Sequence, residues 1–140
     1  MKLAVDTNVL VRAVVQDDPV QARAAAKLLA NAELIAVALP SLCEFVWVLS
    51  KVYAFAASDA AAAIRALLAA ANVQTNRPAV ETGLRMLDAG GDFADGVIAY
   101  EGQWLGGETF VSFDKTAVAL LKAQGHQARL VTSGAGQSPR

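Results

Sequence analysis

The sequence has almost none of the residues that build disulfides and zinc sites. Its 140 residues include one cysteine, Cys43, and one histidine, His126. A single cysteine cannot form an internal disulfide, and without a Cys/His cluster a zinc site is not expected. A chain of this length buries enough core for one domain without such cross-links. We therefore expect one domain that folds in a reducing compartment.

Long apolar runs and an excess of charge of one sign are also missing. No run reaches the roughly 18 apolar residues of a membrane span, and Asp6 interrupts the first residues too early for a signal peptide. We predict a soluble cytoplasmic protein with no membrane partner. The formal net charge of −1 lacks the basic excess of a dedicated nucleic-acid-binding protein. It is compatible with an RNA-processing enzyme, because bound metal ions and a few local Arg or Lys side chains can hold a phosphate backbone.

What is present is an alternation of strand-like and helix-like segments. The patterns predict strands over residues 3–5, 34–39, 109–113 and 128–131 and a brief strand or loop over 72–75. They predict helices over 8–16, 19–32, 40–53, 58–71, 78–89, 93–105 and 114–124. Such alternation gives right-handed crossovers and a parallel sheet covered by helices. The fold class is α/β, a three-layer α/β/α sandwich around a central, mainly parallel sheet. The domain covers residues 1–132, and the Gly/Ser/Pro-rich residues 133–140 are predicted to be a disordered tail.

Polar residues before the helices predict where they begin. Thr7 or Asn8 is the expected cap of the first helix, and Asp18 followed by Pro19 that of the second. Ser58 with Asp59 is expected to cap the fourth. The first strand is expected to be buried.

Four acidic residues stand out because each lies in apolar sequence at a place where such a fold forms sites. Asp6 and Asp114 directly follow predicted strands, and Glu44 and Asp95 fall early in predicted helices. Sites in parallel α/β sheets form at the carboxyl ends of the strands. Carboxylates gathered there repel one another unless a cation compensates them. Mg²⁺ or Mn²⁺ suits an all-oxygen site, so we expect one of these ions.

Each of these acids also has an ordinary structural alternative. Asp6 and Asp114 are each in position to cap the following helix, a role that is compatible with binding a metal. After Gly90-Gly91, Asp92 fits the cap of the next helix, which leaves Asp95 as the expected ligand. Polar residues nearby are expected to support the site: Thr7, Asn8, Asp92 and Ser112.

The helix that carries Glu44 is apolar on nearly every side. Cys43, Trp47 and Val48 lie opposite the regular core stripe, so the helix is either wrapped on all sides or used in self-association. An acid in such a helix must be paired, neutralised or bound to a cation. Lys51 lies two turns away, too far for a direct pair within the helix. Cys43 is interpreted as a core residue, and His126 is given no role.

Taken together, four motifs resemble those of the PIN-domain ribonucleases, in particular the VapC-type toxins of bacterial toxin–antitoxin modules. They are Asp6-Thr7-Asn8-Val9-Leu10, Glu44 in the third helix, Asp92-Phe93-Ala94-Asp95-Gly96-Val97-Ile98-Ala99, and Ser112-Phe113-Asp114. The resemblance implies a PIN fold and a Mg²⁺- or Mn²⁺-dependent endoribonuclease with Asp6, Glu44, Asp95 and Asp114 as the metal-binding catalytic residues. It also implies a homodimer inhibited by a cognate antitoxin whose tail supplies an arginine to the acids. Gly96 departs from the alanine that relatives often carry, a change expected to loosen the first turn of that helix.

Two other functions fit part of the pattern. A catalytically inactive PIN-like scaffold would bind RNA or protein without cutting, but the four acids argue against it. A Mg²⁺-binding receiver domain of a signalling system would need paired acids after the first strand, where Asp6 stands alone. Its lysine after a late strand would have to be Lys115, which directly follows an acid. The ribonuclease is the interpretation that uses all four acids.

Overall fold

The computed structural model describes residues 1–132, so the tail predicted over residues 133–140 lies outside the described residues. The chain divides into two compact units, the first from Met1 to Arg77 and the second from Pro78 onward. Each unit contains its own parallel strands and helices, and each is described by itself.

The first unit is built on a three-stranded parallel sheet in the order β1-β2-β3. The strands are β1 (Lys2–Ala4), β2 (Leu34–Ala36) and β3 (Val73–Gln74). Leu3 of β1 lies opposite Ile35 of β2, which in turn lies opposite Val73 of β3. The prediction of a buried first strand over residues 3–5 is wrong for β1 itself, because β1 is an edge strand on which Leu3 is half-buried and Ala4 is exposed. Val5, directly after it, is buried.

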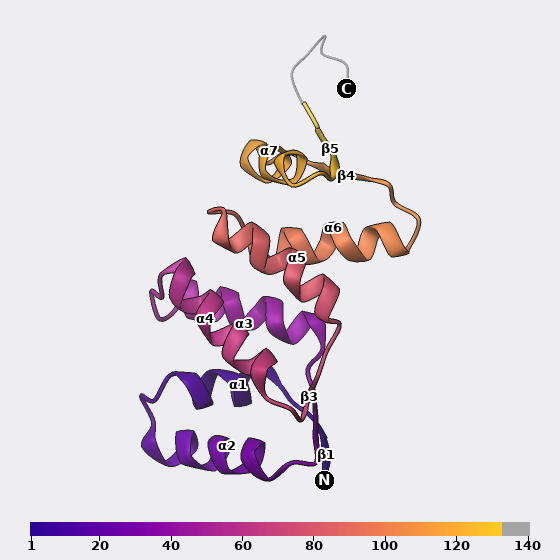
Figure 1. Ribbon diagram of the computed structural model, residues 1–140. Helices are drawn as coiled ribbons and strands as arrows, with labels where there is room; N and C mark the ends of the chain where they lie inside the picture. The colour runs from indigo at the N-terminus through magenta and orange to yellow at the C-terminus, as the bar shows by residue number, and fades with distance from the viewer. Residues whose placement is uncertain (133–140) are drawn as a thin grey trace. The chain divides into compact units, whose positions relative to one another are not determined.

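Four helices pack in this unit, and Figure 1 shows them on one side of the labelled strands β1 and β3. They are α1 (Thr7–Val14), α2 (Pro19–Asn31), α3 (Leu39–Lys51) and α4 (Ala57–Ala69). Each turns its apolar stripe inward, as the 3.6-residue spacing predicts. The buried side chains include Leu10, Ile35, Leu42, Phe45, Leu49 and Ile64.

The helix starts confirm one predicted cap in this unit and correct two. Asp18 caps α2 and accepts a hydrogen bond from the Gln21 amide at 3.1 Å. The first helix is capped by Asp6, not by Thr7 or Asn8, and begins one residue earlier than predicted. The fourth begins after Ala56 with no side-chain cap, so Ser58 and Asp59 fall inside it. Burial of its alanine and isoleucine face is enough to position this helix.

The second unit pairs β4 (Thr109–Ser112) and β5 (Gln127–Leu130) as parallel strands. Its helices are α5 (Arg77–Asp88), which starts at the boundary, α6 (Phe93–Trp104) and α7 (Lys115–Ala123). Met86, Ala99 and Leu121 from the three helices form a buried cluster, against which Phe110 and Ala128 of the strands pack. The predicted positions of these elements are confirmed to within one or two residues.

Helices α5 and α6 approach each other closely through two glycines. A methyl group at Gly83 would lie 2.8 Å from the ring of Phe93, and one at Gly96 would lie 2.6 Å from the carbonyl oxygen of Thr82. Only glycine leaves room for such backbone contact. Gly90, with φ of +89°, ends α5 where the sequence predicts a stop.

Parallel strands alternating with helices in both units confirm the α/β class. Over residues 1–132, no helix has the length and apolar character needed to cross a membrane.

Candidate metal centre

In the first unit, Asp6 and Glu44 are linked through Thr7. Asp6 follows β1, and its Oδ1 accepts a hydrogen bond from the Thr7 amide at 2.8 Å. Thr7 is buried, and its hydroxyl donates to Oε1 of Glu44 at 3.4 Å. The turn after the first strand therefore contacts the helix that carries the second acid, as the sequence pattern requires.

Glu44 differs from expectation in its surroundings. It lies in the second turn of α3, because the helix begins at Leu39, and its side chain is exposed. The helix is not wrapped on all sides, since Trp47 exposes 59% of its surface. On the second apolar face of α3, Cys43 and Val48 are half-buried and Trp47 is exposed, so the expectation that the helix surrounds Glu44 with apolar side chains is wrong.

The second unit positions its acids by helix capping. Asp92 caps α6, accepting from the Ala94 amide at 3.0 Å, and Asp95 is the third residue of that helix. The predicted division between a capping Asp92 and a separate Asp95 in the first turn is confirmed. Asp114 caps α7 through Oδ1, which accepts from the amides of Thr116 and Ala117 at 2.9 and 3.1 Å.

Ser112 holds Asp114 from the other side. Its hydroxyl oxygen accepts a hydrogen bond from the Asp114 amide at 3.0 Å, so the end of β4 fixes the backbone of the acid. In both Asp6 and Asp114 the capping bonds go to Oδ1. Because a carboxylate has two oxygens, capping a helix and binding a cation are compatible roles for these residues.

Electrostatics single out Asp95 in this unit. Its half-buried position raises the pKa of its carboxyl group, and the nearby charges of Asp92 and Asp114 raise it further. The charges of two other carboxylates therefore act on Asp95 within the second unit. Such repulsion is what a divalent cation relieves.

Asn8, the remaining polar residue predicted to support the site, is exposed on α1, where it lines a groove of about 320 Å³ together with Arg12 and Leu28. His126, to which the sequence gave no role, is half-buried, and burial together with the charge of Arg85 lowers the pKa of its imidazole. Nothing in the sequence around this lone histidine predicts that it is half-buried near Arg85.

Within residues 1–132, neither unit by itself gathers three Asp, Glu, His or Cys side chains in an arrangement that could hold a metal ion. Each unit instead holds two of the four predicted ligands: Asp6 and Glu44 in the first, Asp95 and Asp114 in the second.

A comparison with curated proteins finds no significant match. A comparison with family models matches residues 3–122 to the PIN domain. That segment contains all four acids and extends from β1 into α7. The chain belongs to the PIN domain family.

Proposed function

We propose that this PIN domain is an endoribonuclease that depends on Mg²⁺ or Mn²⁺ and hydrolyses RNA phosphodiester bonds. PIN domains commonly have nuclease activity and typically bind divalent metals. The observation in this chain that carries the proposal is the position of Asp95, where partial burial and then the charges of Asp92 and Asp114 raise the pKa of its carboxyl group. Groups with shifted pKa values are typical of functional sites.

The chemistry of the donor set fits a hard divalent cation. The proposed ligands Asp6, Glu44, Asp95 and Asp114 offer only carboxylate oxygens, the donors that Mg²⁺ and Mn²⁺ prefer. A bound cation would favour ionised Asp95 and offset the partial burial and the repulsion that raise its pKa. When bound, such an ion supplies activation of water and stabilisation of negative charge on the phosphate.

The side chains of this chain would do the rest. Asp95 or Glu44 orients the attacking water and accepts its proton, provided that the carboxylate is not fully engaged in metal binding. Thr7 positions Glu44 through its hydroxyl, and Ser112 positions Asp114 through the backbone amide. Asp92 fixes the first turn of α6, on which Asp95 lies.

We further propose that the nuclease is the toxin of a toxin–antitoxin pair and acts as a homodimer in the cytoplasm. Val52, just after α3, is exposed and leaves apolar surface for a partner. The expected inhibitor is a small antitoxin that presents an arginine to the acids. Induced expression should arrest growth, and the Asp6→Ala variant should relieve the arrest.

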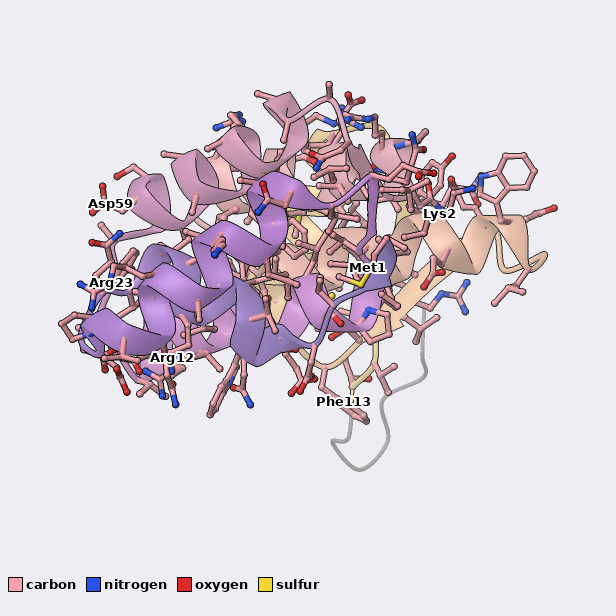
Figure 2. The ribbon with its side chains drawn as sticks, turned by 90° about the horizontal axis from the view of Figure 1, so that it is seen from below. Met1, Lys2, Arg12, Arg23, Asp59 and Phe113 are labelled. Carbon is pink, nitrogen blue, oxygen red and sulfur yellow. The ribbon has the colours of Figure 1, made fainter. Side chains whose placement is uncertain are left out.

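The direct test is cleavage of total cellular RNA by the purified protein with Mg²⁺ or Mn²⁺, with EDTA as a control. Asp6→Ala should lose at least about 100-fold in rate, because even outer-shell partners of a metal contribute about 10–100-fold. Asp59→Ala is the matched variant, since Asp59 is an exposed acid of the same unit (Figure 2), and it should cleave like wild type. Intact RNA under every condition would instead favour a scaffold that binds without cutting.

A further inference from the structure

Helix α3 presents an exposed stripe that combines an acid, an aromatic ring and a base. Glu44, Trp47 and Lys51 are all exposed, at positions i, i+3 and i+7 of one helix face. The opposite face is buried through Leu42, Phe45, Val46 and Leu49. The stripe is therefore fixed on a well-packed helix, with its three side chains in a defined order.

Trp47 is the unusual member of this stripe. It leaves 59% of its surface in solvent one helical turn from Glu44, a proposed metal ligand. Its hydrophobic area is large, and an indole left in water beside a functional group indicates a binding surface. Tryptophan offers a rigid, flat face on which another ring can stack.

We propose that Trp47 stacks on an unpaired base of the RNA next to the phosphate that is cleaved, and that Lys51 contacts a phosphate further along the strand. This inference rests on the proposed nuclease function. Along the axis, Trp47 lies about 4.5 Å and Lys51 about 10.5 Å from Glu44, at 1.5 Å per residue. Stacked nucleotides advance about 3.4 Å each, so the stripe covers about three of them.

Charge on this helix favours RNA over a protein partner. Glu44 and Lys51 are the only charged residues of α3, and both flank Trp47 on its exposed face. The centre of a protein–protein interface is depleted of charged residues. A strand that alternates flat bases with phosphate anions matches an aromatic ring followed by a cation. Because stacking requires a free base face, the substrate is single-stranded or looped RNA.

Intrinsic fluorescence tests the contact directly, because the chain has two tryptophans, Trp47 and Trp104. Trp104 is 75% exposed at the end of α6 and serves as the matched control. A single-stranded oligoribonucleotide is titrated in Ca²⁺ into the Trp104→Phe variant, which keeps only Trp47, and into Trp47→Phe, which keeps only Trp104. We expect saturable quenching in the first and none in the second. Equal responses of the two variants would overturn the proposal.

Kinetics provide the second readout. Trp47→Ala should raise KM for single-stranded RNA about ten-fold, the loss typical of one stacked base, with a smaller change in kcat. Trp47→Phe should recover most of that loss, and Trp104→Ala should behave like wild type. A wild-type protein that cuts no RNA would refute the nuclease itself. If the wild type cleaves RNA but Trp47→Ala and Trp104→Ala have the same KM, only the proposed stacking is refuted.

The oligomeric state separates RNA binding from self-association. The masses of wild type and Trp47→Ala are compared by sedimentation at several concentrations. Unchanged mass with raised KM supports the RNA contact. A drop from dimer to monomer in Trp47→Ala, without quenching of Trp47 by RNA, would show that the stripe is an interface between copies and would overturn the proposal.

Discussion

Gly96 of α6 rests directly against the backbone of Thr82 in α5. A methyl group at Gly96 would lie 2.6 Å from the Thr82 carbonyl oxygen and 2.8 Å from the α-carbon of Gly83. These are backbone atoms, so neither can rotate away. The sequence-based expectation that Gly96 loosens the first turn is wrong, because the glycine allows the close contact that holds this turn. Asp92 and Asp95 lie in the same turn, so the packing of two helices positions two acids.

The first prediction is that Gly96→Ala destabilises the protein. Alanine favours a helix by about 1 kcal/mol over glycine. Overlap with fixed backbone costs typically about 1–3 kcal/mol, so the overlap is expected to prevail. Denaturant unfolding should show a lower midpoint with an unchanged slope.

Gly102→Ala is the matched control, because Gly102 lies in the same helix with no atom within 4 Å of the added methyl. It should gain about 0.5–1 kcal/mol. If both alanines stabilise, the close contact between α5 and α6 is not a constraint in solution.

The sequence predicted the helices well because the apolar spacing that buries one face also defines the element. Asp18, Asp92 and Asp114 were predicted as caps and act as caps. The wrong cap predicted for the fourth helix has a physical cause. The start of α4 at Ala57 depends on which alanines pack inward, and alanine patterns carry little signal for this.

For the four acids, too, the sequence predicted some features and missed others. Their type, order and position after strands could be read directly, and Asp95 could be separated from Asp92 by the capping rule. The exposure of Glu44 and Trp47 could not, because α3 is apolar on two faces and only tertiary packing decides which is buried. The Thr82 contact of Gly96 also joins residues of two helices, and a single sequence does not reveal it.

A second prediction concerns Asn72, which ends the second helix from a distance. Its Nδ2 donates to the carbonyl oxygens of Leu29 at 3.2 Å and Ala32 at 3.0 Å. Asn72→Ala should lower stability by about 1–3 kcal/mol, because partly buried carbonyls lose their partner. Asn31→Ala, an exposed change in the same helix, should stay within about 0.5 kcal/mol. Equal thermal melting of the two variants would argue against this role of Asn72.

Asp95 leads to a third prediction, in which loss of function accompanies a gain in stability. Partial burial and the charges of Asp92 and Asp114 raise the pKa of its carboxyl group in the folded state above the ordinary value of 3.8. The folded state therefore holds the proton more tightly, and its relative stabilisation is present below about pH 3.8 and lost as pH rises through the raised pKa. Asp95→Asn cannot ionise at this position and so does not lose this stability as pH rises. Without metal, its melting temperature should be higher than that of wild type at pH 7 and nearly the same at pH 3.

Metal is expected to reverse the order of the two melting temperatures at pH 7. Adding Mn²⁺ should raise the melting temperature of wild type, because a ligand that binds only the folded state stabilises it, and should raise that of Asp95→Asn much less. Glu101→Gln, an exposed change on the same helix, should leave both the pH dependence and the response to metal unchanged. A difference between wild type and Asp95→Asn that persists at pH 3 would mean that packing, not charge, separates them.

The last prediction divides the two parts of the Thr7 side chain between activity and stability. Its hydroxyl donates to Glu44 at 3.4 Å, and the residue is only 5% exposed. Thr7→Val keeps the shape but loses the hydroxyl, so RNA cleavage should fall several-fold in kcat because Glu44 is less firmly oriented. Its stability should change by no more than about 0.5–1.5 kcal/mol, the usual contribution of one hydrogen bond. Thr7→Ser keeps the hydroxyl and loses a buried methyl, so cleavage should persist while stability falls by about 1 kcal/mol.

Rates are measured well below the melting temperature of both variants, where each is fully folded. If cleavage instead follows stability in both variants, Thr7 contributes packing alone and Glu44 is oriented by other groups.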